Sequence, residues 1–323
     1  MPFIEKSSYK KPPLHQINGH FQTILPSLFR KIEGINYTRE RIELWDSDFL
    51  DLDWMTNGSR KLAIVSHGLE GHSDRHYVKG MVKSFSNAGW DTLAWNCRSC
   101  SGEMNKLPRM YHHGATDDME AVINHVVKTR DYETIVMTGF SMGGGMTLKY
   151  LGENGSNIPD EIKAAAVFSV PVNLHASIPT IHEWQNAFYK IRFLRKLKRK
   201  LRAKAAMYPE LISLEGLDDI NDFYEFDDRY SAPLHGFKDS EDFYSKISAH
   251  QFIPEIKIPT LIVNAKNDPL LPEACYPVTL AKEHPYIYLE IPRVGGHVGF
   301  AIPGEELSYA DRRALEFVEN LEL

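Results

Sequence analysis

The chain has 323 residues, of which 43 % are hydrophobic and 25 % are charged, and its formal net charge is −6. This composition is ordinary for a globular protein, and no apolar run reaches the length of a transmembrane helix, so disorder and membrane spanning are both disfavoured. A mildly acidic chain offers no general cationic face to phosphate groups, which argues against nucleic acid as a partner.

Short apolar runs alternate with amphipathic segments along most of the chain. The runs are typical of buried parallel strands and are Leu62–Ser66, Thr92–Trp95, Thr134–Thr138, Ala164–Ser169, Thr260–Asn264 and Tyr286–Ile291. The helical patterns are Tyr77–Ala88, Thr116–Lys128, Met142–Leu151, Glu273–Lys282 and Tyr309–Leu321. This alternation implies βαβ units with right-handed crossovers, so we predict an α/β fold with a mostly parallel, doubly wound sheet. Ahead of these units, Arg41–Leu44 and Phe49–Trp54 are expected to form a hairpin at one edge.

The alternation breaks in the third quarter of the chain, where the connection is far longer than a loop and a helix require. We predict that residues 172–251 form a helical cap insertion and that residues 1–171 and 252–323 form the core. A cap at this point would lie over the carboxyl ends of the strands, where open α/β sheets bind ligands.

One segment of the predicted cap, Lys190–Lys204, has helical periodicity and a high positive charge. It carries nine cations, and its apolar face is formed by Ile191, Leu194, Leu197 and Leu201. Two interpretations stay open: a solvated cap helix, or a helix that makes peripheral contact with an anionic membrane.

The motif G-x-S-x-G occupies Gly139–Gly143, directly after one predicted strand and directly before a predicted helix. In this setting the glycines permit a strained turn that lifts the Ser141 hydroxyl out of the sheet, and the helix points its first amides at the site. A tight connection or a phosphate-binding loop is the structural alternative, but the lysine of a P-loop is missing. The motif therefore predicts a nucleophilic serine.

A serine needs a base to take its proton and an acid to orient that base. Asp268 follows the strand Thr260–Asn264, and His297 follows the strand Tyr286–Ile291, so both fall at strand carboxyl ends. Each also has a structural reading, as a turn residue before a proline and as a histidine in a glycine loop. Because all three fall at one edge of the predicted sheet in the order serine, acid, histidine, we predict a Ser141, Asp268 and His297 triad.

The oxyanion formed during acyl transfer requires preorganised donors. We assign these to the backbone N–H groups of Met142, which follows the nucleophile, and of Leu69, in the loop after the strand Leu62–Ser66. His67, at the start of that loop, competes as a second base, although its place beside Gly68 favours a role in loop packing.

Cysteines and paired histidines suggest metal or redox sites at first sight. Three cysteines, Cys97, Cys100 and Cys275, are too few for a disulfide framework, and without a secretory signal they favour a cytoplasmic location. The pair Cys97 and Cys100 has C-x-x-C spacing but no second pair, so a loop near the site is favoured. The histidines His72, His76, His112 and His113 lack a carboxylate at a convincing spacing. We therefore expect them at a pocket rim or surface, and we predict no metal.

With these motifs in place, the sequence resembles the YheT-like branch of the α/β-hydrolases, a group of esterases with acylglycerol- and phospholipid-cleaving relatives. The matching stretches are His20–Ile24 with Leu25 and Pro26, His67–Ser73, Asn96, Arg98, Cys100–Gly102, Gly139–Gly145, Asn267–Pro269 and Gly295–Phe300. One departure is that Cys97 and Ser99 stand where the family pattern has an aromatic residue and a glycine. The resemblance implies an α/β-hydrolase fold and a carboxylesterase-type activity, with the triad at Ser141, Asp268 and His297.

The combined prediction is a serine carboxylic ester hydrolase, of carboxylesterase or lipase type, that works through an acyl-enzyme and needs no cofactor. Its expected partner is a small-molecule or lipid acyl ester. Acyl transfer to an alcohol or thiol uses the same residues and stays open as an alternative. The non-enzymatic alternative is a ligand-binding protein on a disabled hydrolase fold, which should have lost a triad member. Epoxide and haloalkane hydrolysis are disfavoured because they require a carboxylate at the position of Ser141.

Overall fold

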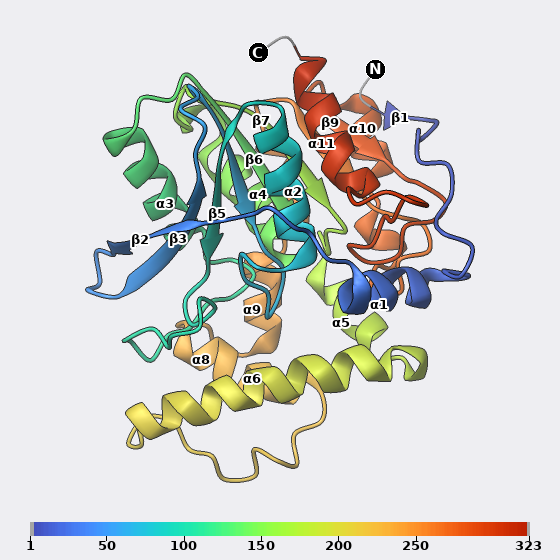
Figure 1. Ribbon diagram of the computed structural model, residues 1–323. Helices are drawn as coiled ribbons and strands as arrows, with labels where there is room; N and C mark the ends of the chain where they lie inside the picture. Colours follow the sequence, from blue (N-terminus) through green and yellow to red (C-terminus); the bar gives the residue numbers. More distant parts are fainter. Residues whose placement is uncertain (1–2, 322–323) are drawn as a thin grey trace.

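In the computed structural model, which describes residues 3–321, one mixed sheet is flanked by helices on both faces (Figure 1). Its strands are β1 (Phe3–Ile4), β2 (Thr38–Glu43), β3 (Phe49–Met55), β4 (Lys61–Ser66), β5 (Asp91–Asn96), β6 (Thr134–Phe140), β7 (Ile162–Phe168), β8 (Thr260–Val263) and β9 (Ile287–Glu290). The helices of the core are α1 (Gly19–Phe29), α2 (His76–Asn87), α3 (Thr116–Thr129), α4 (Met142–Asn154), α10 (Val278–Glu283) and α11 (Tyr309–Glu319).

The strand order is β1-β9-β8-β7-β6-β4-β5-β3-β2, and only β3 runs antiparallel to its neighbours β2 and β5. The register sets Ser66 of β4 opposite Gly139 of β6. On the other side of β6, Phe140 is opposite Phe168 of β7, which is opposite Val263 of β8. Because parallel strands end at the same edge, the loops after β4, β6, β8 and β9 meet there.

Each face of the sheet is buried under its own helices because successive strand residues point to opposite faces. Ile64 points into a core formed with α3, α4 and α10, whereas its neighbours Ala63 and Val65 point into a core formed with α2 and α11. A sheet covered on both faces explains why the strands are continuous apolar runs and not alternating ones. The predicted mostly parallel, doubly wound α/β fold is confirmed.

The predicted elements agree with the structure apart from three differences. Glu273–Lys282 was expected to be one helix, which is wrong: a 3₁₀ turn over Glu273–Cys275 is separated from α10 by Pro277. Proline has no N–H to donate and its ring displaces the preceding backbone, so the helix restarts after it. The other two differences are β1 and α1, which were not predicted because their sequences show no clear apolar periodicity. The hairpin of β2 and β3 lies at the sheet edge as predicted.

Residues 172–251 are mostly helical, with a long non-helical loop over residues 208–222, and lie together on one side of the sheet, with α6 running across them (Figure 1). They form α5 (Leu174–His182), α6 (Ala187–Met207), α7 (Phe223–Phe226), α8 (Ala232–Leu234), α9 (Ser240–Ile247) and a π-helical turn at Asp227–Ser231. They have a small apolar core of their own that includes Leu194, Leu201 and Tyr230. That this segment behaves as a separate insertion stays a prediction.

The face of α6 that packs on the protein differs in one position from the predicted face. Leu194 and Leu201 are buried and Leu197 is half-buried, but Ile191 is 62 % exposed. Lys204 is fully buried, and its Nζ donates hydrogen bonds to the carbonyl oxygens of Asn105 and Leu107 in the core. The helix is therefore tied to the core by a polar contact as well as by apolar packing.

Two leucine-sized side chains on α6 provide a matched test of this packing. We expect Leu201→Ala to lower the free energy of unfolding by about 2–5 kcal/mol, because it leaves a cavity in the core of residues 172–251. Ile191→Ala on the same helix should change it by less than about 1 kcal/mol, because the side chain is already exposed. Denaturant unfolding followed by circular dichroism measures both values. Equal effects of the two substitutions would contradict the orientation of α6.

Candidate active site

Ser141 occupies the turn between β6 and α4 in a strained backbone conformation, with φ 52° and ψ −120°. A Cβ on Gly143 would come within 2.5 Å of the carbonyl oxygens of Ser66 and His67, and a Cβ on Gly139 within 2.6 Å of the Gly143 oxygen. These contacts are with backbone atoms that cannot give way, so both positions require glycine. The two glycines therefore permit the close approach of β4, β6 and α4 that holds the strained Ser141 at the end of β6.

The side chains of Ser141, His297 and Asp268 form a continuous hydrogen-bonded row. His297 Nε2 lies 2.9 Å from Ser141 Oγ, and His297 Nδ1 lies 2.8 Å from Asp268 Oδ2. The Asp268 side chain is fully buried, and that of His297 is 10 % exposed. The other carboxylate oxygen, Oδ1, accepts a hydrogen bond from the backbone N–H of Leu270 at 2.9 Å. The structure therefore brings together the three side chains that the sequence predicted.

Helix α1, for which we predicted no catalytic role, holds the loop that carries His297 through side-chain hydrogen bonds. Thr23 Oγ1 accepts a hydrogen bond from His297 N at 2.8 Å, and Gln22 Oε1 accepts bonds from Gly295 N at 2.8 Å and Asn267 Nδ2 at 2.9 Å. Gln22 thus joins the loop that carries the aspartate to the loop that carries the histidine. The one sequence signal for these contacts was the family resemblance at His20–Ile24.

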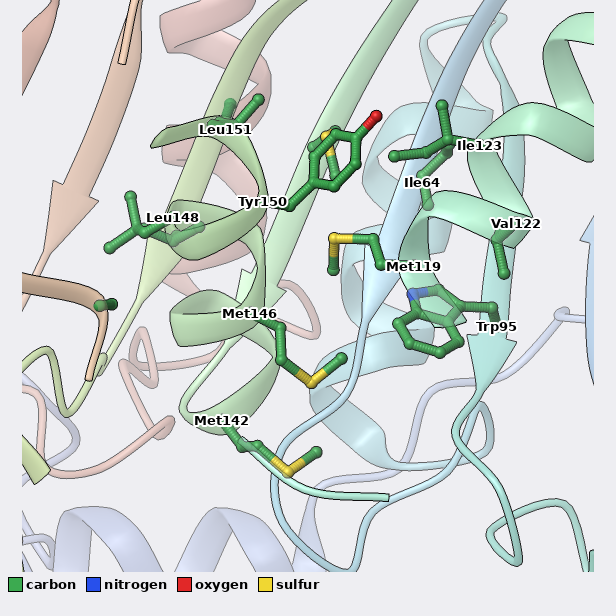
Figure 2. Close-up of a cluster of buried hydrophobic side chains, with 14 of the residues drawn as sticks. Ile64, Trp95, Met119, Val122, Ile123, Met142, Met146, Leu148, Tyr150 and Leu151 are labelled. Carbon is green, nitrogen blue, oxygen red and sulfur yellow. The ribbon is translucent and has the colours of Figure 1, made fainter. Parts of the chain in front are cut away.

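The two predicted oxyanion donors lie beside the serine and are unoccupied by other acceptors. Among the hydrogen bonds of residues 3–321, neither Leu69 N nor Met142 N donates to another residue. The Met142 side chain anchors the start of α4, pointing with Met146 toward Trp95 and Met119 in the core (Figure 2). This packing fixes the position of the Met142 N–H next to Ser141.

His67, the competing base, has both ring nitrogens engaged in holding its own loop. Nδ1 is 2.8 Å from the Gly68 carbonyl oxygen, to which it must donate, and Nε2 accepts a hydrogen bond from Cys97 N at 3.1 Å. The ring is 1 % exposed, and burial lowers the pKa of His67 to about 3. The role in loop packing fits this geometry, since no ring nitrogen is left to take a proton from Ser141.

The remaining cysteines and histidines lie near the site without forming a cluster. Cys97 and Cys100 are buried free thiols, and burial raises the pKa of both. The four histidines line pockets, namely His72, His76, His112 and His113. Within residues 3–321, no group of three or more histidine, cysteine, aspartate or glutamate side chains is arranged so that it could hold a metal ion.

Two pockets meet at Ser141 and His297, of about 860 and 740 Å³, counting space open to solvent. The first, here the apolar chamber, is lined by Leu174, Ile178, Ile181, Leu197, Phe223 and Phe243. The second, here the cationic chamber, is lined by Arg75, Arg192 and Lys196, with Thr23, Ser27, His76 and one acidic residue, Glu70. Ser141 therefore lies where the apolar chamber and the cationic chamber meet.

Comparisons with known proteins agree with the observed fold. A family model described as the alpha/beta hydrolase fold matches residues 64–301. YheT of Escherichia coli (strain K12), a protein provisionally named an esterase, is 33 % identical over 289 residues, covering 88 % of this chain and 84 % of YheT. The phospholipase ABHD3 of Mus musculus is 29 % identical over 310 residues, covering 92 % of this chain and 75 % of ABHD3. Among solved structures, the Pyrococcus furiosus esterase Pf2001 has the same fold, with a TM-score of 0.58 at 19 % identity over 88 % of this chain and 92 % of that one.

Histidines around the site make the free energy of unfolding depend on pH. Burial lowers the pKa of His67 and His76 to about 3 and that of His113 to about 4, from about 6.5 in an unfolded chain. Between these values the unfolded state binds more protons, so stability is present at neutral pH and is lost on acidification. Burial raises the pKa of Asp118 and Asp227 to about 6, so on acidification the folded state takes up protons at these two carboxyls first. This opposes the effect of the three histidines.

We therefore expect the unfolding temperature at pH 5 to lie below that at pH 7.5. Three histidines against two carboxyls leave one net proton taken up on unfolding. Below the ordinary histidine pKa of about 6.5, this proton corresponds to a loss of about 1.4 kcal/mol in the free energy of unfolding per pH unit. Scanning calorimetry at constant ionic strength measures the two temperatures. An unfolding temperature that is constant or rises on acidification would show that the buried carboxyls dominate instead.

Proposed function

Because the chain belongs to the α/β-hydrolase fold family, in its YheT-like branch, and is a hydrolase, we propose that it cleaves carboxylic acyl esters with Ser141 as nucleophile. The observation that carries the proposal is the row of hydrogen bonds from Ser141 Oγ through His297 to the buried Asp268. A strained serine with a base at 2.9 Å and an acid behind that base is the constellation that nucleophilic acyl transfer requires.

In the first half of the proposed reaction, Ser141 Oγ attacks the ester carbonyl carbon while His297 Nε2 takes the hydroxyl proton. The Asp268 carboxylate accepts the Nδ1–H of the imidazolium and stabilises its charge. The carbonyl oxygen becomes an oxyanion, to which Leu69 N–H and Met142 N–H would donate, with the amino end of α4 adding favourable potential. The intermediate collapses when the alcohol oxygen leaves with the proton from His297, and the acyl-enzyme remains.

In the second half, His297 takes a proton from water, and the hydroxide attacks the acyl carbon of the acyl-enzyme. Ser141 Oγ regains its proton from His297 as the carboxylic acid departs. The apolar chamber supports an acyl chain as the group retained on the serine, because its walls are aliphatic and aromatic side chains. Transfer to an alcohol would replace only the water, so product analysis with added acceptor alcohol distinguishes the two reactions.

Removal of the nucleophile gives the direct test. We expect Ser141→Ala to lower kcat on p-nitrophenyl octanoate by about 10³-fold or more, because no acyl-enzyme can form. A fluorophosphonate probe should label wild-type protein at Ser141 and should leave the variant unlabelled, as mass spectrometry of the peptides would report. Asp268→Asn should retain the fold but reduce kcat by about 10²- to 10⁴-fold, because the imidazole loses its orienting acceptor.

Ser245→Ala is the matched control, because Ser245 is exposed on α9 and its hydroxyl bonds only to a backbone carbonyl oxygen of its own helix. Its kcat and labelling should equal those of the wild type. Undiminished activity in Ser141→Ala would defeat the proposed mechanism, and inactivity of wild-type protein on esters of graded chain length would favour the ligand-binding alternative.

Peripheral membrane contact through residues 190–204 is a second part of the proposal, since lipid esters are among the substrates it includes. The exposed side chains Phe188, Ile191, Arg195 and Arg199 combine apolar and cationic groups along α6. Within residues 3–321, no helix combines the length and apolar character needed to cross a bilayer. We expect cosedimentation with phosphatidylglycerol vesicles that Ile191→Glu weakens, and equal binding by both proteins would remove this part. The cytoplasmic location stays a prediction, which cell fractionation tests.

A further inference from the structure

Three positive side chains converge on the cationic chamber from two separate elements. Arg75 stands at the start of α2, while Arg192 and Lys196 are one turn apart on α6, so both face the same side of that helix. All three are half-buried and share the pocket with Ser141 and His297. Cations are thereby held next to the groups that would cleave the ester.

None of these three side chains forms an ion pair with a carboxylate within residues 3–321. Among residues 3–321, the Arg75 side chain donates only to the Ser27 hydroxyl at 3.1 Å, Lys196 Nζ donates only to the Glu70 carbonyl oxygen at 3.1 Å, and the Arg192 side chain has no hydrogen bond or ion pair. Lys200, one helical turn after Lys196 on the same side of α6, forms an ion pair with the Glu70 carboxylate at 2.8 Å. Lys200 therefore has a carboxylate partner, whereas Arg192 and Lys196, which line the pocket with Ser141, form no ion pair.

Holding these cations together is unfavourable in the absence of an anion. Burial and the nearby Arg75 lower the pKa of Arg192. Burial lowers the pKa of Lys196, the Glu70 carboxylate raises it, and Arg75 and Arg192 lower it further. Half-buried charges that repel one another lose solvation without gaining a partner. An anionic ligand in the chamber would remove this cost and would gain charge-assisted hydrogen bonds.

Two neighbouring features add polar groups suited to an anion. No side chain caps the first turn of α2, which begins at the wall of this chamber and carries positive potential at its amino end. His76, also in the wall, has a buried Nδ1 without a hydrogen-bond partner among residues 3–321. Both features leave donor capacity beside the three cations.

We propose that the cationic chamber binds a phosphate group on the alcohol portion of the substrate, while the apolar chamber holds the acyl chain. This inference rests on the proposed function and names the substrate class, a phosphorylated alcohol carrying an acyl ester. The bond from the acyl carbon to Ser141 Oγ forms first, and the bond from the acyl carbon to the alcohol oxygen breaks when the tetrahedral intermediate collapses. The phosphorylated alcohol leaves with the proton that His297 carries, and the phosphate itself is unchanged.

Two substrates that differ only in the phosphate test the proposal, namely octanoyl-glycerol phosphate and octanoyl-glycerol, both below their micelle concentrations. We expect wild-type kcat/KM to be at least about tenfold higher for the phosphate ester. The double variant with Arg192→Gln and Lys196→Gln should lose about ten- to a hundredfold on the phosphate ester, mainly through KM. On the uncharged ester its loss should be several-fold smaller, because no contact with a phosphate is removed there.

Arg195→Gln is the matched control, because Arg195 is an exposed cation of the same helix outside the cationic chamber. It should preserve the preference for the phosphate ester. Equal losses on both substrates in the double variant, or a wild-type preference for the uncharged ester, would overturn the proposal.

A binding measurement separates this proposal from the function on which it rests. Calorimetric titration of Ser141→Ala protein with glycerol phosphate should show binding that the added Arg192→Gln and Lys196→Gln substitutions remove. Equally tight binding of inorganic phosphate would assign the site to free phosphate and overturn the substrate assignment. If wild-type protein hydrolyses neither ester, the proposed function fails, and the titration alone decides whether the anion site exists.

Discussion

The close approach of β4, β6 and α4 at Gly139 and Gly143 is the constraint from which the arrangement of the site follows. Backbone atoms stand where a side chain would be, so the chain turns sharply and holds Ser141 at a positive φ. The register of the parallel strands then puts the loops after β4, β8 and β9 at the same edge. The histidine, the aspartate and the Leu69 amide meet the serine because each loop starts from a strand whose end is fixed.

Glu70 connects this rigid edge to the helices above it. Its carboxylate binds Lys200 of α6 and the Tyr111 hydroxyl, its backbone N–H donates to that hydroxyl, and its carbonyl oxygen accepts from Lys196. The residue itself has a positive φ. The loop that carries the Leu69 amide is therefore fastened to α6 at several points. Residues 172–251 and the loop that carries the candidate oxyanion donor are therefore joined by direct contacts of Glu70 with Lys196 and Lys200.

The parts of the site that could be predicted are those with a local signature. Ser141 stands in a motif whose glycines are needed by its own turn, and Asp268 and His297 follow apolar runs that are unmistakably strands. The cationic chamber could not be predicted, because Arg75 and Arg192 line one pocket only through the tertiary placement of α6 and carry no pattern along the chain. The exposure of Ile191 was missed for a similar reason, since helical periodicity defines an apolar stripe but tertiary packing decides how far along the helix it is covered.

The contribution of α1 has a consequence for how the domain is delimited. The family model matches residues 64–301, and all three candidate catalytic side chains fall inside that stretch. Thr23 and Gln22, which hold the backbone of the histidine loop, do not. A shortened chain starting at Thr38 would keep the whole reactive row and most of the sheet but would leave His297 N and Gly295 N without acceptors. The stretch that the family model matches is therefore shorter than the stretch that holds the candidate histidine in place.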